Sequence, residues 1–465
     1  MSDSAYDVAV IGSGPGGSAA ALTGARRGLR VCLIEREHIG GICLNTGCIP
    51  TKSLVTVATM VRRMRRARQF GITIGEPQVD YPAVLARNQR IVATLRAGLT
   101  DVLRREGVEL LSGSATFEDP HHLTVARQGQ TQRLSVQRVV IATGARPLSG
   151  PWPIDEHRVL SYRGLLALPV IPPSLLIIGG GVIGCEFASL LAAFGTRVTI
   201  VEQQPQLLPM DDPEAVRWVA RRLHADGVTM HVNTTVTRLA ASANGVTATL
   251  ADGTDVKAAY ALLAMGQRPN IESLQLPAAG VAAGRGVTVD AYLRTSQPHI
   301  AAIGDCLEGH GLAHWASADG RLAVENLLSA QTLAPDAAMI PRCVFTEPEL
   351  AQVGPVAVEG RDVRVSRFSF GALGKSYCDE ETEGFVKLFV DPATDQVRGA
   401  TIVGAHASSL IQMAVLAVQQ HLTARQLAQT ITAHPTLPES LTEAAAYFYG
   451  ESLCVAARAR SRAVA

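Results

Sequence analysis

Short apolar runs along the chain end on glycine or on an acidic residue, and the segments between them fit helices. Residues 6–11 (YDVAVI) predict a buried strand, and an Ala-rich stretch after it predicts a helix. Residues 29–34 predict a second strand that ends on Glu35. Strands that alternate with single helices are typical of parallel sheets. The pattern therefore predicts an α/β fold that begins with a strand–helix–strand unit.

A glycine-rich turn joins the first strand to its helix. The order G-x-G-x-x-G, helix, strand and acid is the dinucleotide-binding fingerprint, and it is formed here by Gly12, Gly14, Gly17 and Glu35. The first glycine permits the tight turn, the second lets backbone N–H groups approach a pyrophosphate, and the third lets helix and strand pack closely. The positive end of the helix favours the anion. Glu35 can accept hydrogen bonds from ribose hydroxyls.

The same pattern recurs after a strand predicted at residues 174–178. A helix runs to about Ala193, and a strand at residues 197–201 ends on Glu202; the glycines of this turn are Gly179, Gly181 and Gly184. The first glycine and the acid stand 23 positions apart in both copies. One fingerprint is a weak signal, but two copies with the acid at the same offset predict two Rossmann-like domains that bind two dinucleotides.

Three further apolar runs are predicted to be strands of the same sheets. Residues 139–144 and 261–266 close on small residues and are each followed by Arg-Pro, and residues 300–303 lead directly to Gly304 and Asp305. In an open α/β sheet the carboxyl ends of the strands face the ligand crevice. We therefore expect Asp305 to point toward a bound nucleotide.

Two cysteines, Cys43 and Cys48, follow the first strand–helix–strand unit. A disulfide needs Cα atoms within about 4.4–6.8 Å, whereas five residues of a regular helix rise about 7.5 Å. Gly47 and the approach to Pro50 can supply the distortion. Two buried thiols or half of a zinc site are the alternatives, but zinc sites usually show a second pair at such spacing, which we do not find. The pair therefore predicts redox chemistry and no metal site.

A proton acceptor for such a dithiol stands near the end of the chain. The thiolate is the reactive form in disulfide exchange. Pro435 and Pro438 keep His434 out of a helix interior, and Glu439 stands at the predicted start of the next helix. A carboxylate bonded to one ring nitrogen fixes the tautomer and raises the basicity of the imidazole. A lone histidine beside proline is usually structural, and Glu439 strengthens the case for a base.

The composition excludes several other classes of protein. The chain has 465 residues and a formal net charge of +1. This length fits about three domains, and the charge gives no footprint for nucleic acid. The sequence has no apolar stretch long enough for a membrane span and no signal peptide, so we expect a cytoplasmic protein. Residues 62–68, with five arginines, fit a solvated helix face or, alternatively, a docking site for an acidic partner.

These pieces occur in the order and spacing of the class I pyridine nucleotide-disulfide oxidoreductases, and the resemblance covers nearly the whole chain. Residues 40–54 (GGICLNTGCIPTKSL) and 433–439 (AHPTLPE) are most similar to the dihydrolipoamide dehydrogenases, and residues 344–354 resemble the start of the family's dimerisation domain. The resemblance implies an FAD-binding domain at residues 1–146 and 270–338. It also implies an NAD-binding domain at 147–269 and a C-terminal α+β dimerisation domain at 339–465.

The resemblance also implies a role for each site residue. Cys48 is the thiol beside the flavin, Cys43 is the thiol that meets substrate, and His434, oriented by Glu439, comes from the other subunit of a homodimer. Lys52 lies near the flavin and pairs with Glu186. The remaining implied contacts with FAD are Gly12, Gly14, Gly17, Glu35, Ala115, Thr143, Gly144, Asp305, Leu312, Ala313 and His314; those with NAD are Gly179, Gly181, Gly184, Glu202, Val236 and Gly266.

The implied reaction couples NAD+ and NADH to the oxidation of dihydrolipoamide, or of a lipoyl-protein, through a Cys43–Cys48 disulfide. An NADH-dependent reductase of another small disulfide is the alternative. A mercuric reductase requires a C-terminal cysteine pair and Tyr in place of His434, and a glutathione-type reductase requires cations near Glu202; the sequence has neither. A non-catalytic redox-sensing flavoprotein belongs to a different class, and the intact pair with His434 and Glu439 argues against it.

Three segments depart from the family pattern. Residues 404–409 (GAHASS) lack an expected glutamate, Asp319 stands where the family more often has glutamate, and residues 456–465 form an Arg- and Ala-rich tail of unfamiliar pattern. These departures bear on the choice of substrate and partner more than on the redox chemistry.

Glu202 predicts a preference for NAD over NADP. Its carboxylate pairs with a free ribose 2′-hydroxyl and repels a 2′-phosphate, and the next two residues, Gln203 and Gln204, carry no positive charge. We expect a higher kcat/KM with NADH than with NADPH in steady-state kinetics. A clear preference for NADPH would contradict this interpretation of Glu202.

Overall fold

The computed structural model describes residues 4–309, 311–329, 331, 333, 334, 336–355 and 363–456. The chain divides into two compact units, each assembled from segments that lie far apart in sequence. The first contains residues 1–54, 80–170 and 265–335, and the second contains residues 55–79, 171–264 and 336–465. Of the tail noted above, residues 457–465 lie outside the described residues.

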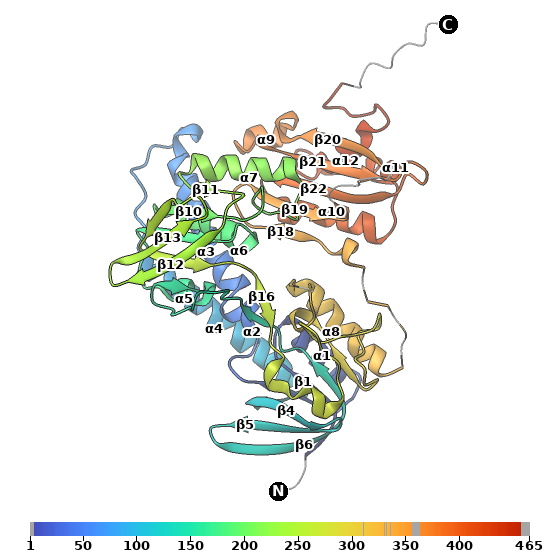
Figure 1. Cartoon of the computed structure of the whole chain (residues 1–465). Helices are drawn as coiled ribbons and strands as arrows, with labels where there is room; N and C mark the ends of the chain where they lie inside the picture. Colours follow the sequence, from blue (N-terminus) through green and yellow to red (C-terminus); the bar gives the residue numbers. More distant parts are fainter. Residues whose placement is uncertain are drawn as a thin grey trace. The chain divides into compact units, whose positions relative to one another are not determined.

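A seven-stranded sheet forms the centre of the first unit, with the order β3-β2-β1-β6-β5-β4 and β17 paired to β6 (Figure 1). The strands are β1 Ser4–Ile11, β2 Val31–Glu35, β3 Glu109–Ser112, β4 Ser114–Asp119, β5 His122–Arg127, β6 Gln130–Ile141 and β17 Ile300–Ala302. β1, β2, β3, β6 and β17 run parallel, and β4 and β5 form an antiparallel extension. Two shorter strands, β7 Ala145–Pro147 and β16 Gln267–Pro269, pair antiparallel, and β8 is Val159–Leu160.

Helices of the first unit cover this sheet because its central strands are apolar on both faces. Val8, Leu33 and Val140 are completely buried, as expected of parallel strands with helices on both sides. α1 and α8 pack against each other (Figure 1). The helices are α1 Pro15–Arg26, α2 Gly41–Asn45, α4 Tyr81–Arg105, α5 Tyr162–Ala167 and α8 Ala313–Leu327; α3 Cys48–Arg65 begins here and its later residues belong to the second unit.

The second unit contains a parallel sheet with the order β11-β10-β9-β15 and two antiparallel sheets. The parallel strands are β9 Ser174–Ile178, β10 Arg197–Val201, β11 Thr229–His231 and β15 Tyr260–Leu263, with helices α6 Val182–Ala193 and α7 Pro213–Ala225. A three-stranded sheet follows, formed by β12 Val236–Ser242, β13 Gly245–Leu250 and β14 Asp255–Ala258.

The C-terminal part of the second unit is an antiparallel sheet with the order β18-β19-β22-β21-β20, packed against helices. Its strands are β18 Arg342–Val344, β19 Glu349–Val353, β20 Arg364–Ser369, β21 Gly384–Val390 and β22 Val397–Gly404; its helices are α9 Gly374–Cys378, α10 Ala407–Gln419, α11 Ala424–Ala428 and α12 Glu439–Tyr447. Phe368, Leu388 and Ile411 lie in its core. The predicted class, an α/β fold with a C-terminal α+β domain, is confirmed. No helix among the described residues has the length and apolar content needed to cross a bilayer.

Strand boundaries agree best where turn residues bracket the apolar run. The strands predicted at residues 174–178 and 197–201 coincide with β9 and β10. The strand predicted at 29–34 begins two residues later, at Val31, because Gly28 has a positive φ of 79° and the N–H of Arg30 donates to Asp7 Oδ2. Those residues belong to the turn.

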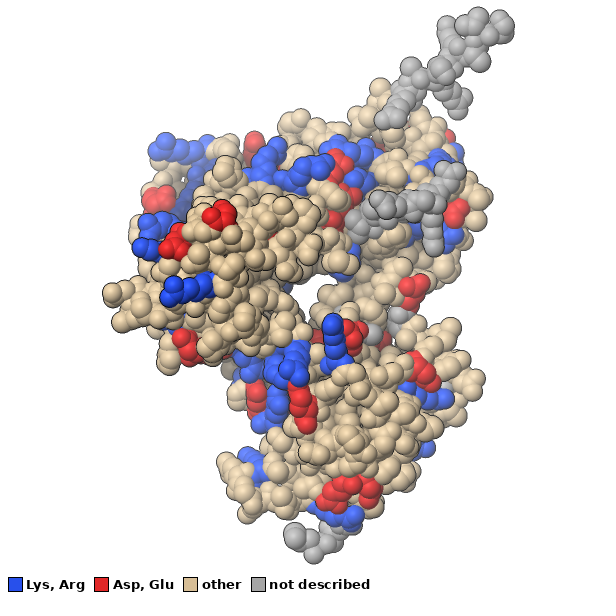
Figure 2. All heavy atoms as spheres, viewed as in Figure 1, with Lys and Arg blue, Asp and Glu red and all other residues tan. Residues whose placement is uncertain are grey.

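The arginine-rich run at residues 62–68 is not simply a solvated helix face. Arg62 is 6% exposed; its guanidinium donates to Ser189 O (2.6 Å) and pairs with Asp226 (2.8 Å) and Glu347 (3.5 Å). Arg66 pairs with Glu347 at 3.3 Å. Arg62 therefore ties α3 to α6, α7 and the turn before β19 within the second unit. Elsewhere, Figure 2 shows basic and acidic side chains interspersed over the visible surface.

Substitution of Arg62 tests this network. Arg62→Leu leaves the carboxylates of Asp226 and Glu347 without their buried partner, so we expect a loss of about 3 kcal/mol in the free energy of unfolding. Arg63→Leu is the control, since Arg63 is exposed on the same helix. Urea denaturation followed by circular dichroism measures both, and equal midpoints for the two variants would contradict a buried role for Arg62.

Candidate active site

Residues that follow three parallel strands of the first unit gather at one edge of its sheet. The register aligns the last residues of β1, β6 and β17, which are Ile11, Ile141 and Ala302. Gly12, Thr143 and Asp305 come one to three residues after these ends. This carboxyl edge is where open α/β sheets bind ligands.

The first glycine turn has the geometry that the fingerprint predicts. Gly12 has a φ of 101°. A Cβ at Gly17 would lie 1.8 Å from Gly12 O, whereas a Cβ at Gly14 would meet nothing within 4 Å. The carboxylate of Glu35 accepts from Ser13 N (3.0 Å) and Ser13 Oγ (2.6 Å). The acid therefore holds the turn while the space beside Gly14 stays open.

The second turn repeats this arrangement in the second unit. A Cβ at Gly184 would lie 2.1 Å from Gly179 O, and one at Gly181 would meet nothing within 4 Å. Glu202 is buried, and its two oxygens accept from Gly180 N (2.6 Å) and Gln204 N (2.7 Å).

Both turns fit the phosphates of a dinucleotide. α1 begins after Gly14 and α6 begins after Gly181, and neither helix has a side-chain cap at its N-terminus. The first N–H groups of a helix need a partner, and a pyrophosphate supplies one with the matching charge. Gly14 and Gly181 are the N-cap residues of the two helices, and a Cβ at either position would meet nothing within 4 Å.

The two cysteines lie on either side of a break between helices. Cys43 is in α2, which ends at Asn45, and Cys48 begins α3. Thr46 leaves the helical region with a φ of −141°, and a Cβ at Gly47 would lie 3.0 Å from Ile42 O. The break thus occurs at Thr46 and Gly47, as predicted for Gly47, whereas Pro50 lies in the first turn of α3, where proline is tolerated.

The side chains of the pair meet across this break. A side-chain hydrogen bond with Cys48 is the largest cause that raises the pKa of the Cys43 thiol, burial is the second, and the positive charge of Lys52 opposes both. Lys52 follows Cys48 by one turn of α3. The hydrogen bond with Cys48 and burial therefore favour the protonated form of Cys43 in this dithiol.

α4 supports the dithiol segment through side chains that no motif in the sequence singles out. Asn88 Nδ2 donates to Pro50 O (3.2 Å), and Arg87 Nη1 donates to Ser53 Oγ (2.9 Å). Arg96 Nε donates to Asn45 Oδ1 (2.8 Å). Their spacing resembles that of solvent-facing residues on any amphipathic helix, so no sequence signal distinguishes them.

The other predicted FAD contacts are distributed over the first unit. Ala115 is buried in β4, and Thr143 O accepts from Asn270 Nδ2 (3.2 Å). Gly144 follows with a positive φ of 66°. Leu312 precedes α8 as its N-cap, and Ala313 and His314 form its first turn.

The remaining predicted nucleotide contacts belong to the second unit or border it. Val236 is buried at the start of β12, and Gly266, just after Met265, has a φ of 109°. Glu186 is 3% exposed in α6, and its Oε1 accepts from Phe345 N (3.0 Å). Lys52 belongs to the first unit and Glu186 to the second, so their pairing stays a prediction.

His434 and Glu439 form the predicted dyad in the second unit. His434 Nδ1 lies 2.8 Å from Glu439 Oε1, and Thr436 N donates to Glu439 Oε2 (2.7 Å). Burial raises the pKa of Glu439, but the bonds from Thr436 and His434 outweigh it and hold the pKa below its usual range. The His434 side chain is 77% exposed. The dyad therefore presents an oriented imidazole with Nε2 directed away from the carboxylate.

Comparison with known proteins identifies the family. Residues 6–320 match the family described as pyridine nucleotide-disulphide oxidoreductase, and residues 340–445 match its dimerisation domain. The chain belongs to this family. It is therefore an FAD-dependent disulfide oxidoreductase. Family membership confirms the two predicted cofactors, FAD and NAD.

Similar proteins match over nearly their whole length. The dihydrolipoyl dehydrogenase of Bacillus subtilis (strain 168) is 36% identical over 94% of this chain and 97% of its own, and that of Chlamydia muridarum is 37% identical over 95% and 96%. Among solved structures, LpdA from Mycobacterium tuberculosis is 30% identical with a TM-score of 0.88, covering 95% of this chain and 99% of its own. A Cu(II) complex of the HOCl-induced flavoprotein disulfide reductase RclA from Escherichia coli is also 30% identical, with a TM-score of 0.86 and coverage of 96% and 99%.

Loss of the imidazole should slow dithiol turnover. A general base typically contributes about 10²–10⁴-fold to a rate, so we expect His434→Gln to lower kcat for dithiol-dependent NAD+ reduction by that order. Glu439→Gln should lower it less, because the ring stays but loses its orienting carboxylate. Glu443→Gln on the same helix is the control, since Glu443 binds Ser452 and Leu453 instead. Stopped-flow reduction with a dithiol measures the effect, and wild-type rates in His434→Gln would exclude it as the base.

Proposed function

We propose that this oxidoreductase transfers electrons from dihydrolipoamide, free or attached to a protein, to NAD+. The dithiol of Cys43 and Cys48 together with the His434–Glu439 dyad carries the proposal. The many relatives called dihydrolipoyl dehydrogenase support the choice of substrate. Glu202, buried beside Gly180, supports NAD as the acceptor.

The first step is a thiol–disulfide exchange at Cys43. His434 takes the proton of one substrate thiol, and the resulting thiolate attacks Cys43 Sγ. The Cys43–Cys48 bond breaks, a mixed disulfide forms between substrate and Cys43, and Cys48 leaves as a thiolate. Lys52, a basic residue, follows Cys48 by one turn of α3.

The second exchange releases the product. The other substrate thiol attacks the substrate sulfur of the mixed disulfide, the bond from that sulfur to Cys43 breaks, and the proton of the attacking thiol passes to Cys43 as it leaves. The substrate therefore departs with its two sulfurs joined. Cys43 and Cys48 then hold the electron pair as a reduced dithiol. FAD and NAD+, when bound, supply the hydride chemistry that carries this pair onward.

We propose that a homodimer completes the site. His434 lies within the match to the dimerisation domain, and the dyad belongs to a different unit from Cys43. Ile431, three residues before the base, is 98% exposed; so exposed an apolar side chain favours burial against a second subunit. In this arrangement His434 serves Cys43 of the partner subunit.

The domain assignment accompanies this proposal. Residues 1–146 and 270–338 bind FAD, residues 147–269 bind NAD, and residues 339–465 mediate dimerisation. The contacts with FAD and NAD are those named from the resemblance, including Lys52 paired with Glu186. The FAD assignment is supported by the register of β1, β6 and β17, which aligns their last residues, Ile11, Ile141 and Ala302.

Reduction of another small disulfide by NADH is the second candidate. It is favoured by the likeness to RclA, which is described as a flavoprotein disulfide reductase. A panel with free lipoamide, a lipoylated protein domain and glutathione disulfide separates the two functions. A kcat/KM for another disulfide that exceeds the value for both lipoyl substrates would favour the second candidate.

Serine substitutions test the dithiol itself. Cys43→Ser and Cys48→Ser each remove one sulfur of the exchanging pair, so we expect loss of dihydrolipoamide-driven NADH formation with FAD still bound. Absorbance of NADH and of the flavin measures both properties. Cys378→Ser, at an exposed cysteine of the second unit, is the control. Normal turnover in Cys43→Ser would overturn the proposal.

A further inference from the structure

The short helix α2, which carries Cys43, is not stable by itself. α2 has five residues, none of them buried, and its N-cap Gly40 supplies no side-chain hydrogen bond. A helix of this length is unstable in isolation because nucleation is costly, and it gains little from apolar burial. Side-chain hydrogen bonds, in addition to the backbone bonds of the helix, must therefore fix α2, and with it the position of Cys43.

Asn45, the last residue of α2, supplies most of these bonds. Its Nδ2 donates to Gly41 O (2.8 Å), Ile39 O (3.0 Å) and, at a longer distance of 3.4 Å, His38 O. These carbonyls belong to the first turn of α2 and to the segment that leads into it. The amide thus closes the short helix onto its own beginning, two residues after Cys43 and three before Cys48.

The orientation of this amide depends on Arg96. Arg96 Nε donates to Asn45 Oδ1 at 2.8 Å. A guanidinium has donors only, so it binds the oxygen of the amide and directs the NH₂ group toward the carbonyls of Ile39 and Gly41. α4, which carries Arg96, has 25 residues and a side-chain N-cap from Asp80. It is a far more stable support than α2.

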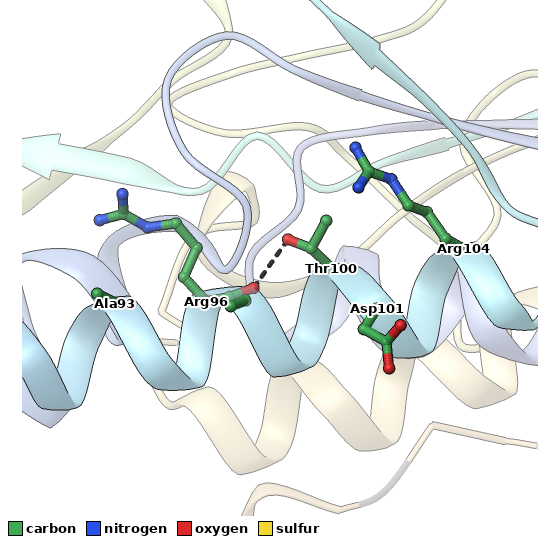
Figure 3. A pocket seen from close by; sticks show the side chains of 6 residues that line it. Ala93, Arg96, Thr100, Asp101 and Arg104 are labelled. Carbon is green, nitrogen blue, oxygen red and sulfur yellow. Dashed lines mark hydrogen bonds between the residues drawn. The ribbon is translucent and has the colours of Figure 1, made fainter.

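Arg96 also borders an open hollow of about 400 Å³ along α4. Ala93, Thr100, Asp101 and Arg104 line it as well (Figure 3). Arg104 is exposed and, among the described residues, its side chain makes no hydrogen bond or ion pair. Arg96 and Arg104 thus lie on the same helix, carry the same charge and line the same hollow. Only Arg96 contacts the dithiol segment.

We infer that Arg96 is a positioning residue for the dithiol: through Asn45 it fixes α2 and keeps Cys43 within bonding reach of Cys48. The inference deepens the proposed function, since it rests on the pair being redox-active. Disulfide geometry tolerates only a narrow range of Cα separations. A loosened α2 therefore weakens the disulfide form more than the dithiol form.

The equilibrium between the cysteine pair and a dithiothreitol buffer tests this inference without any lipoyl substrate. A hydrogen bond to a charged group has an effect of about tenfold on an equilibrium constant. We expect Arg96→Ala to shift the purified, FAD-loaded enzyme by about that factor toward the dithiol. Arg104→Ala is the matched control and should stay within about twofold of wild type. Alanine is the best helix former, so α4 is retained in both.

A second variant asks whether Arg96 acts through Asn45. If it does, Arg96→Ala adds little to Asn45→Ala, because coupled residues are non-additive. Equal equilibria for Arg96→Ala and Arg104→Ala, or additive effects of Arg96→Ala and Asn45→Ala, would overturn the inference. Failure of the proposed function looks different: the wild-type pair would then form no disulfide in the buffer at all, or would form it without any turnover of lipoyl substrates.

Discussion

Both glycine-rich turns depend on a contact between backbones that leaves no room for a side chain. At Gly17 and at Gly184 the helix approaches the preceding turn so closely that a Cβ would fall 1.8 Å and 2.1 Å from a carbonyl oxygen. This approach brings the uncapped starts of α1 and α6 to the carboxyl edges of their sheets. The acids at the ends of β2 and β10 then complete each turn by binding its N–H groups.

The first of these turns also holds the segment that leads into the dithiol. Ser13 Oγ donates to Glu35 (2.6 Å) and accepts from Gly40 N (3.0 Å), and a Cβ at Gly41 would lie 2.8 Å from Gly14 Cα. α2 therefore starts directly on the first glycine-rich turn. The turn holds the beginning of the cysteine segment, and α4 holds its end through Asn45 and Pro50.

Much of this organisation could be predicted from the sequence because it is encoded locally. Fingerprint glycines, apolar runs and the spacing of the cysteines are properties of neighbouring residues, and the structure places β9 and β10 where the pattern does. The His434–Glu439 bond was also predictable, since both residues lie within six positions of each other and flank two prolines.

The remainder depends on partners that lie far away in sequence. Charge patterning favoured a solvated face for Arg62, but Ser189, Asp226 and Glu347 bury it. Arg96 is 51 residues from Asn45, and no local rule pairs them. The predicted partners Lys52 and Glu186 belong to different units, so their pairing stays a prediction.

Glu202 has a consequence for how this protein could change its coenzyme. Its carboxylate is buried and accepts hydrogen bonds from Gly180 N and Gln204 N. Replacement by a basic residue to admit a 2′-phosphate would remove the acceptor of both N–H groups and loosen the second glycine-rich turn. The same carboxylate thus selects the coenzyme and stabilises the turn. A change of preference toward NADP therefore requires compensating substitutions in the turn as well as at Glu202.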